Sequence, residues 1–167
     1  MKTINNDIVE ARVGFPNAKL LKEKGFSVPT ESSYTLYLKT NKSDNPSFRT
    51  KKGELEISSG YTINNHPSDL SNKNYVKYSR PTQQVVIDWI RLNFDIHISI
   101  LSKKSLDWQS VYHIELDFIY PKEDIDIDTP DAKYYKLPNS FKNEFNTPEE
   151  AKEAAINYVL PHVRIIQ

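Results

Sequence analysis

The chain has 167 residues, of which 38% are hydrophobic and 26% charged, which predicts a soluble globular protein with one core. It contains no cysteine, which excludes disulfides, cysteine–zinc sites and thiol catalysis. The 22 Lys and Arg balance the 22 Asp and Glu, and a neutral chain is atypical of a general polyanion binder. The charge is nevertheless uneven: residues 1–80 carry 13 Lys and Arg against 8 Asp and Glu, and residues 81–167 carry 9 against 14. This difference favours a bipolar surface or complementarity between the two halves.

The sequence has no feature that is typical of a membrane protein. No apolar run reaches the roughly 18 residues that a membrane-spanning helix needs. Residues 1–15 also lack the hydrophobic core of a signal peptide. We therefore expect a cytoplasmic protein without membrane contact, and the absence of cysteine agrees with a reducing compartment.

Hydrophobic periodicity predicts three helices, each with a proline in its first turn, and at least four strands. Near Asp95 the apolar period changes from 3.6 to 2, so a helix containing Trp89 is expected to lead directly into a strand. In chain order the predicted elements are a helix from Pro16, strands at 33–40 and 54–61, a helix at 81–94, strands at 96–102 and 111–119, and a helix from Pro148. The polar segment 64–78 is predicted to be a loop that is mobile or serves as a contact surface.

Alternation assigns a face to the residues of two predicted strands. In the strand at 54–61, Leu55 and Ile57 are expected to point toward the core. In the strand at 111–119, the alternate apolar residues are expected to be buried and the polar residues between them to face water. The apolar face comprises Tyr112, Ile114, Leu116 and Phe118, and the polar face comprises His113, Glu115 and Asp117.

This order of helices and strands predicts a single α+β domain over residues 1–167. We expect two layers, with a mainly antiparallel sheet and about three helices. Residues 121–146 contain three prolines and are predicted to be an irregular excursion, with a short edge strand at 133–137. The sequence leaves the strand order open.

Three segments match a known pattern in the same order along the chain: AKLLKEKGF at 18–26, PTQQVVIDWIRLNFDIHISI at 81–100 and TPEEAKEAAI at 147–156. Together they resemble a family of small uncharacterised proteins encoded by phages and prophages of Bacteroidota. The chain departs from the pattern at Leu92-Asn93-Phe94 and has a longer region at 103–146. The resemblance implies an α+β phage protein that acts inside a bacterial host, and it implies no activity, cofactor or catalytic residue.

A basic segment lies between the first two predicted strands. Its residues are Lys39, Lys42, Arg49, Lys51 and Lys52, with Phe48 between them. The cations could contact phosphates while the Phe48 ring stacks on a base, or the same residues could contact a protein partner. Because the whole chain is neutral, the sequence favours a solvated hairpin tip over a nucleic-acid interface.

An acidic segment places aspartate at every second position, at Asp124, Asp126 and Asp128. This spacing resembles that of the first ligands of a calcium loop. The loop pattern then fails, because Thr129 stands where glycine should turn the chain and Tyr135 where a bidentate Glu should close it. The three aspartates are therefore interpreted as an acidic edge that faces solvent or a partner.

Three residues of the predicted 96–119 hairpin are candidate metal ligands, namely His97, His113 and Glu115. The hairpin is expected to bring His97 close to Glu115 across the strands. No ligand spacing here is diagnostic of a metal site, so we predict that the protein holds neither a metal nor another cofactor.

The sequence contains no phosphate loop, nucleophile motif or catalytic triad, which favours a protein without enzymatic activity. The first hypothesis is a small phage-encoded accessory protein that binds a host or phage macromolecule, with a protein partner favoured and counter-defence as one candidate role. The alternative is a nucleic-acid-binding protein that uses the basic segment 39–52. A metal-dependent enzyme that uses His97 and His113 ranks last.

Overall fold

The computed structural model describes residues 10–43, 49–64, 73–104, 110–118, 141 and 143–163. In chain order its elements are α1 (Phe15–Glu23), β1 (Thr30–Tyr37), β2 (Leu55–Thr62), β3 (Tyr75–Ser79), α3 (Gln83–Phe94), β4 (Ile96–Lys104), β5 (Ser110–Phe118) and α4 (Pro148–Val159). The predicted α+β class is confirmed. Most of the predicted excursion at 121–146, including the edge strand expected at 133–137, lies outside the described residues.

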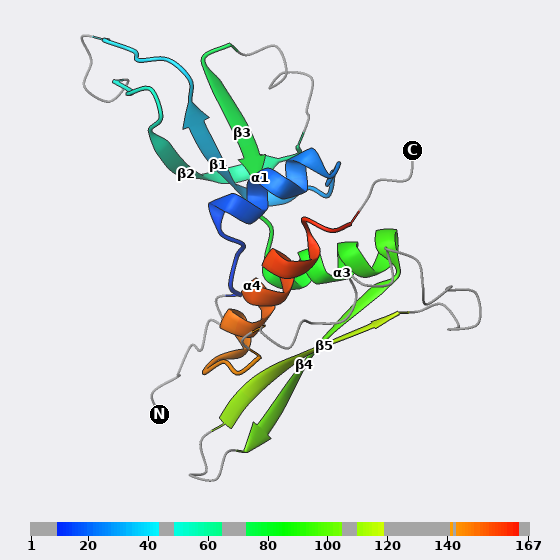
Figure 1. The fold of residues 1–167 in the computed structure, drawn as a ribbon. Helices are drawn as coiled ribbons and strands as arrows, with labels where there is room; N and C mark the ends of the chain where they lie inside the picture. Colours follow the sequence, from blue (N-terminus) through cyan, green and yellow to red (C-terminus); the bar gives the residue numbers. More distant parts are fainter. Residues whose placement is uncertain are drawn as a thin grey trace, which may run out of the picture.

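The described strands form two antiparallel sheets, as Figure 1 shows. The first sheet has the order β2-β1-β3, with α1 packed on one face, and the second is the β4–β5 hairpin. Helices α3 and α4 lie between the two sheets in this view, and both contact the hairpin. All pairings are antiparallel, as predicted, and β1 pairs with a strand on each side.

Strand β3 corrects the prediction of a loop at 64–78, since its residues pair with β1. Tyr78 lies opposite Tyr34, and the Phe15 ring of α1 packs edge-on against both, with ring centroids 5.4 and 5.5 Å away. Tyrosine and valine favour strands, but the Lys and Asn residues around them hide this signal in the sequence. The strand depends on pairing with a distant segment, so local composition could not reveal it.

The prediction that Leu55 and Ile57 point into the core is also wrong, since they are 41% and 60% exposed. Ile57 pairs with Tyr34 and therefore shares the face of the sheet on which α1 lies. That helix packs against the β1 and β3 side, through Phe15, and does not bury the edge strand β2. Alternation thus identifies the face but does not tell whether a helix covers it.

The helix-to-strand transition at Asp95 is confirmed. Pro81 and Thr82 precede α3, and the Thr82 hydroxyl accepts the N–H of Val85. Asp95 ends the helix in the left-handed conformation, with φ of 56°, and β4 starts at the next residue. Because one residue reverses the chain, α3 packs directly over the hairpin that it precedes.

Trp89 lies in the core, as predicted, and is 9% exposed. Its ring packs edge-on against Phe26 and Phe94, with centroids 5.3 and 5.2 Å away. One cluster of buried residues continues from Phe26, which follows α1, to Ile114 in β5 and Ile156 in α4. The two sheets therefore share a core through the helices between them.

The carboxylate of Glu153 joins three helices. Its Oε1 accepts the backbone N–H of Gly14 at 3.0 Å and the side-chain amide of Asn17 at 2.8 Å, both at the start of α1. Its Oε2 accepts the side-chain amide of Gln83, the first residue of α3, at 3.0 Å. The N-cap residue of α1 is Gly14, which has no side chain that could cap the helix. The Glu153 carboxylate of α4 therefore lies at the N-terminus of α1, where a negative charge is favourable.

The outer edge of β5 is covered by the segment before α4. Phe145 exchanges two backbone hydrogen bonds with Tyr112, at 2.9 and 3.1 Å. The side-chain amide of Asn143 does the same for Ile114, accepting from its N–H at 2.7 Å and donating to its carbonyl at 3.1 Å. A side chain thus satisfies backbone groups that another strand would otherwise pair with.

Within the described residues, no helix has the length and apolar character needed to cross a membrane.

Candidate functional site

The chain extends the β1–β2 pairing beyond both strands into a projecting end that we call the basic hairpin tip, residues 38–43 and 49–54. Asn41 and Thr50 exchange two backbone hydrogen bonds there, at 2.9 and 3.2 Å. Gly53 has a φ of 84° and donates its N–H to the last residue of β1 at 2.8 Å. Glycine adopts that backbone conformation without strain, which accounts for its place at the turn.

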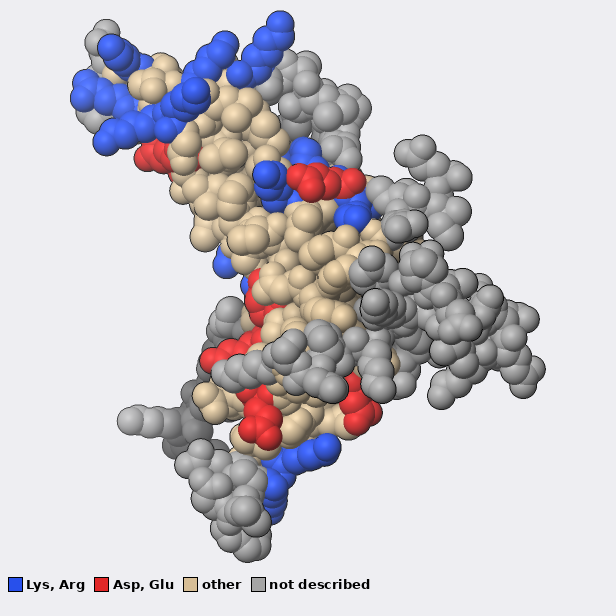
Figure 2. Space-filling view, in the orientation of Figure 1, with Lys and Arg blue, Asp and Glu red and all other residues tan. Residues whose placement is uncertain are grey.

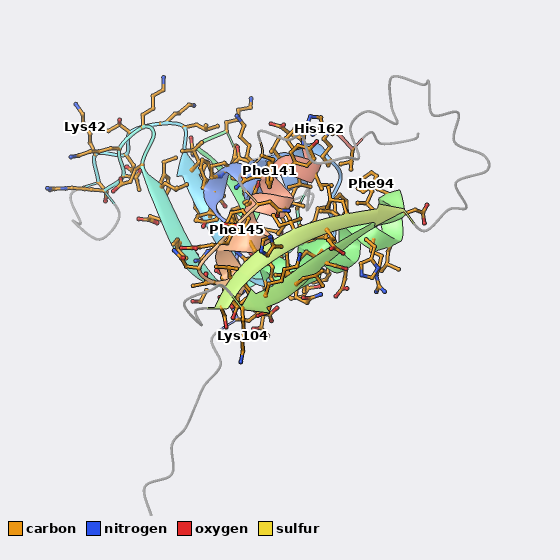
Figure 3. All side chains as sticks on the ribbon, turned by 60° about the horizontal axis from the view of Figure 1, so that its bottom comes forward. Lys42, Phe94, Lys104, Phe141, Phe145 and His162 are labelled. Atoms are coloured by element: carbon orange, nitrogen blue, oxygen red, sulfur yellow. The ribbon has the colours of Figure 1, made fainter. Side chains whose placement is uncertain are left out.

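The described part of the tip carries five exposed cations: Lys39, Lys42, Arg49, Lys51 and Lys52. Figure 2 shows them as a group of basic side chains at one end of the molecule. Glu54 is the one acidic residue among the described residues of the tip, and its carboxylate accepts the N–H of Lys51 at 2.7 Å. Figure 3 places Lys42 at this end and Lys104 at the end of the other hairpin.

The structure therefore brings together four of the five contact residues that the sequence predicts. These are Lys42, Arg49, Lys51 and Lys52. Arg49 donates from Nε to the carbonyl of Ser43 at 2.8 Å, which orients its guanidinium across the tip. Phe48, the predicted stacking residue, lies outside the described residues.

A pocket of about 500 Å³ lies between the tip and β3. Its lining includes Tyr37, Lys39, Asn41, Glu56, Asn74 and Tyr75. A second hollow, of about 390 Å³, is lined by three cations of the tip and by Glu54, and the two hollows share Thr40, Asn41 and Thr50. They adjoin at the Asn41–Thr50 bridge, so the pocket opens next to a concentration of positive charge.

Hydrogen bonds and ring contacts hold the wall of the pocket. The Tyr37 hydroxyl donates to Oε2 of Glu56 at 2.8 Å, and its ring packs edge-on against Tyr75 with centroids 6.4 Å apart. The N–H of Leu38 donates to the carbonyl of Asn74 at 2.7 Å and so ties the tip to β3. Both tyrosines are half-buried, so their rings are fixed yet reachable.

The hydrogen bond to Glu56 raises the pKa of Tyr37 from 10.0 to about 12, and partial burial adds to the effect. Tyr37 is therefore protonated at every physiological pH and keeps donating to the carboxylate. The stabilisation from this bond is complete below about pH 10 and is lost as the pH rises through about 12.

The sequence did not point to the pocket residues Tyr37, Asn74 and Tyr75. The sequence predicts a strand at Tyr37 and a loop at Tyr75, and 38 positions separate the two residues. The antiparallel register of β1 and β3 sets them directly opposite each other. The alternation of Val76 and Tyr78 with Lys77 and Ser79 is a short local signal that is compatible with a strand there.

The candidate metal ligands share one face of the hairpin, but among the described residues they do not form a metal-binding group. His97 lies directly opposite Asp117, and Glu115, which lies opposite Ser99, is its diagonal neighbour on the same face, so the expected proximity of His97 and Glu115 is confirmed. His113 lies opposite Leu101, four residues along β4 from His97, which is roughly 13 Å in a strand. Within the described residues, no three side chains of His, Asp or Glu are close enough together to hold a metal ion.

The acidic edge predicted at Asp124, Asp126 and Asp128 lies outside the described residues.

Comparisons with models of protein families, with curated proteins and with solved structures found no match for the chain. The resemblance to phage proteins therefore stays a prediction, and the function has to be inferred from the site.

Proposed function

We propose that the protein acts by binding a macromolecule rather than by catalysis, and that the basic hairpin tip binds the phosphate backbone of a nucleic acid. The observation that carries this proposal is the group of five exposed cations at the tip, with Glu54 as the one described acid among them. Arg and Lys are the side chains that neutralise backbone phosphates. Such an accessory role fits the phage-encoded protein in a bacterial host that the sequence resemblance implies.

The neutral net charge of the chain is a weak objection to this proposal. Exposed charges are largely screened beyond a Debye length, about 8 Å at physiological ionic strength. The tip projects from the core, and the start of α4, which carries Glu149 and Glu150, lies away from it (Figure 1). A ligand at the tip therefore meets a local positive field rather than the average charge of the molecule.

The test is to measure how strongly the protein binds a labelled nucleic acid of about 20 nucleotides by fluorescence anisotropy, over a series of salt concentrations. The tip variant Lys42→Ala/Lys51→Ala/Lys52→Ala is expected to bind at least about tenfold more weakly and to reduce the slope of log K against log salt by about 2. The reason is that each lost phosphate contact removes the release of condensed counterions.

The matched control changes two lysines at the end of the other hairpin, Lys103→Ala/Lys104→Ala, and is expected to bind as the wild type does. If both variants weaken nucleic-acid binding by the same factor for each lysine removed, the nucleic acid is attracted by positive charge anywhere on the surface. That result would contradict a site at the tip. If the wild type binds labelled polyglutamate more tightly than the labelled nucleic acid, the partner of the tip is instead an acidic protein.

A further inference from the structure

We infer that the pocket beside the basic hairpin tip holds one unpaired nucleobase, so that the protein prefers single-stranded nucleic acid to duplex. This inference rests on the proposed function and names the form of nucleic acid that the tip would bind. It concerns the pocket between the tip and β3 rather than the cations themselves.

The position of the pocket supports a nucleotide as its ligand. The hollow is lined by Lys42, Arg49, Lys51 and Glu54, and it shares Thr40, Asn41 and Thr50 with the pocket. A strand whose phosphates lie on these cations would pass the mouth of the pocket, where one base could turn inward. Its volume, about 500 Å³, is within the usual range for small-molecule sites and has room for a base with part of its sugar.

The side chains of the pocket suit a base better than a peptide side chain of the kind that the tip would attract. A basic tip attracts acidic partners, yet the pocket is lined by one acid, Glu56, and one cation, Lys39, so a carboxylate gains no net attraction inside it. A base has no negative charge and presents N–H groups that the Glu56 carboxylate could accept. The tyrosine rings supply a stacking surface, which every base can use.

The pocket is already formed without a ligand. Tyr37 is held by its hydrogen bond to Glu56, and Tyr75 by the Tyr37 ring and by the Lys77 ammonium, which lies 5.8 Å from its ring centroid. The Leu38 N–H fixes the backbone of Asn74. Because these contacts exist beforehand, little conformational entropy would be lost when a base binds.

The same geometry disfavours a duplex. A paired base would have to leave the stack before it could enter the pocket, and the free energy of unpairing would be subtracted from binding. The cations at the tip can contact either form. The preference for single strands therefore depends on the pocket alone, which makes the two contributions separable.

The test compares binding of a labelled single strand and of the duplex with the same sequence, at one salt concentration, for the wild type and for Tyr75→Ala. The wild type is expected to bind the single strand about tenfold more tightly than the duplex. Tyr75→Ala is expected to weaken single-strand binding about tenfold and to leave duplex binding and the salt slope unchanged. Tyr75→Leu keeps an apolar side chain in β3, so it should have the same effect without loss of packing.

The control is Tyr61→Ala, which removes a tyrosine of the same sheet that is 74% exposed and outside the pocket, and it should bind as the wild type does. Circular dichroism of each variant checks that the fold is retained. Equal affinity of the wild type for single strand and duplex, or unchanged binding by both Tyr75 variants, would contradict the inference. If the tip variant still weakened binding in that case, the proposed function would stand and only the base pocket would be rejected.

Discussion

Trp89→Ala is expected to lower the free energy of unfolding by about 3–5 kcal/mol, which is a large part of the stability of a domain of this size. The side chain is 9% exposed and fills the space between Phe26 and Phe94. Its removal would leave a cavity that these edge-on rings cannot close without losing their own contacts. Urea denaturation followed by circular dichroism measures the change.

The control for this variant is Leu92→Ala, on the same helix. Leu92 is 75% exposed, so its truncation should change stability by no more than about 0.5 kcal/mol. If Trp89→Ala stays within about 1 kcal/mol of the wild type, Trp89 does not support the core in the way described.

Glu153→Ala is expected to cost about 2–4 kcal/mol, because it removes the acceptor of three hydrogen bonds. Asn17 and Gln83 are 0% and 5% exposed, so water cannot easily replace the lost carboxylate. Glu153→Gln keeps one acceptor oxygen and should cost less than the alanine variant. Thermal and urea denaturation both report the difference.

Glu149 provides the comparison for this change, since it is an exposed glutamate in the first turn of the same helix. Glu149→Ala should cost only a few tenths of a kcal/mol, from the loss of a favourable charge at the helix N-terminus. Equal losses for the two alanine variants would show that the junction of the three helices does not depend on the carboxylate.

The sequence predicted the parts of the fold that short-range patterns determine. Pro81, the apolar spacing around Trp89 and the alternation after Asp95 all lie within one continuous segment, and each agreed with the others. The errors arose where a second segment decides the outcome. Strand β3 exists because β1 pairs with it, and Ile57 is exposed because α1 stops short of β2.

The same distinction applies to the candidate site. The cations of the tip are close in the sequence, so their grouping could be predicted from composition alone. The pocket required the register that sets Tyr37 opposite Tyr75. Glu153 resembles an ordinary surface charge on a helix, and its partners lie 70 to 139 residues away. No local pattern carries that information.

The amide of Asn143 has a consequence for how molecules of this protein behave toward one another. In β5 the alternate residues Tyr112, Ile114 and Leu116 favour a strand, and the open edge of such a strand can pair with another chain. Asn143 and Phe145 occupy the backbone hydrogen-bonding groups of Ile114 and Tyr112, through which such pairing would begin. Without Asn143 and Phe145 these groups would be open at the edge of the hairpin, so the segment ahead of α4 protects this part of β5 from pairing with another chain.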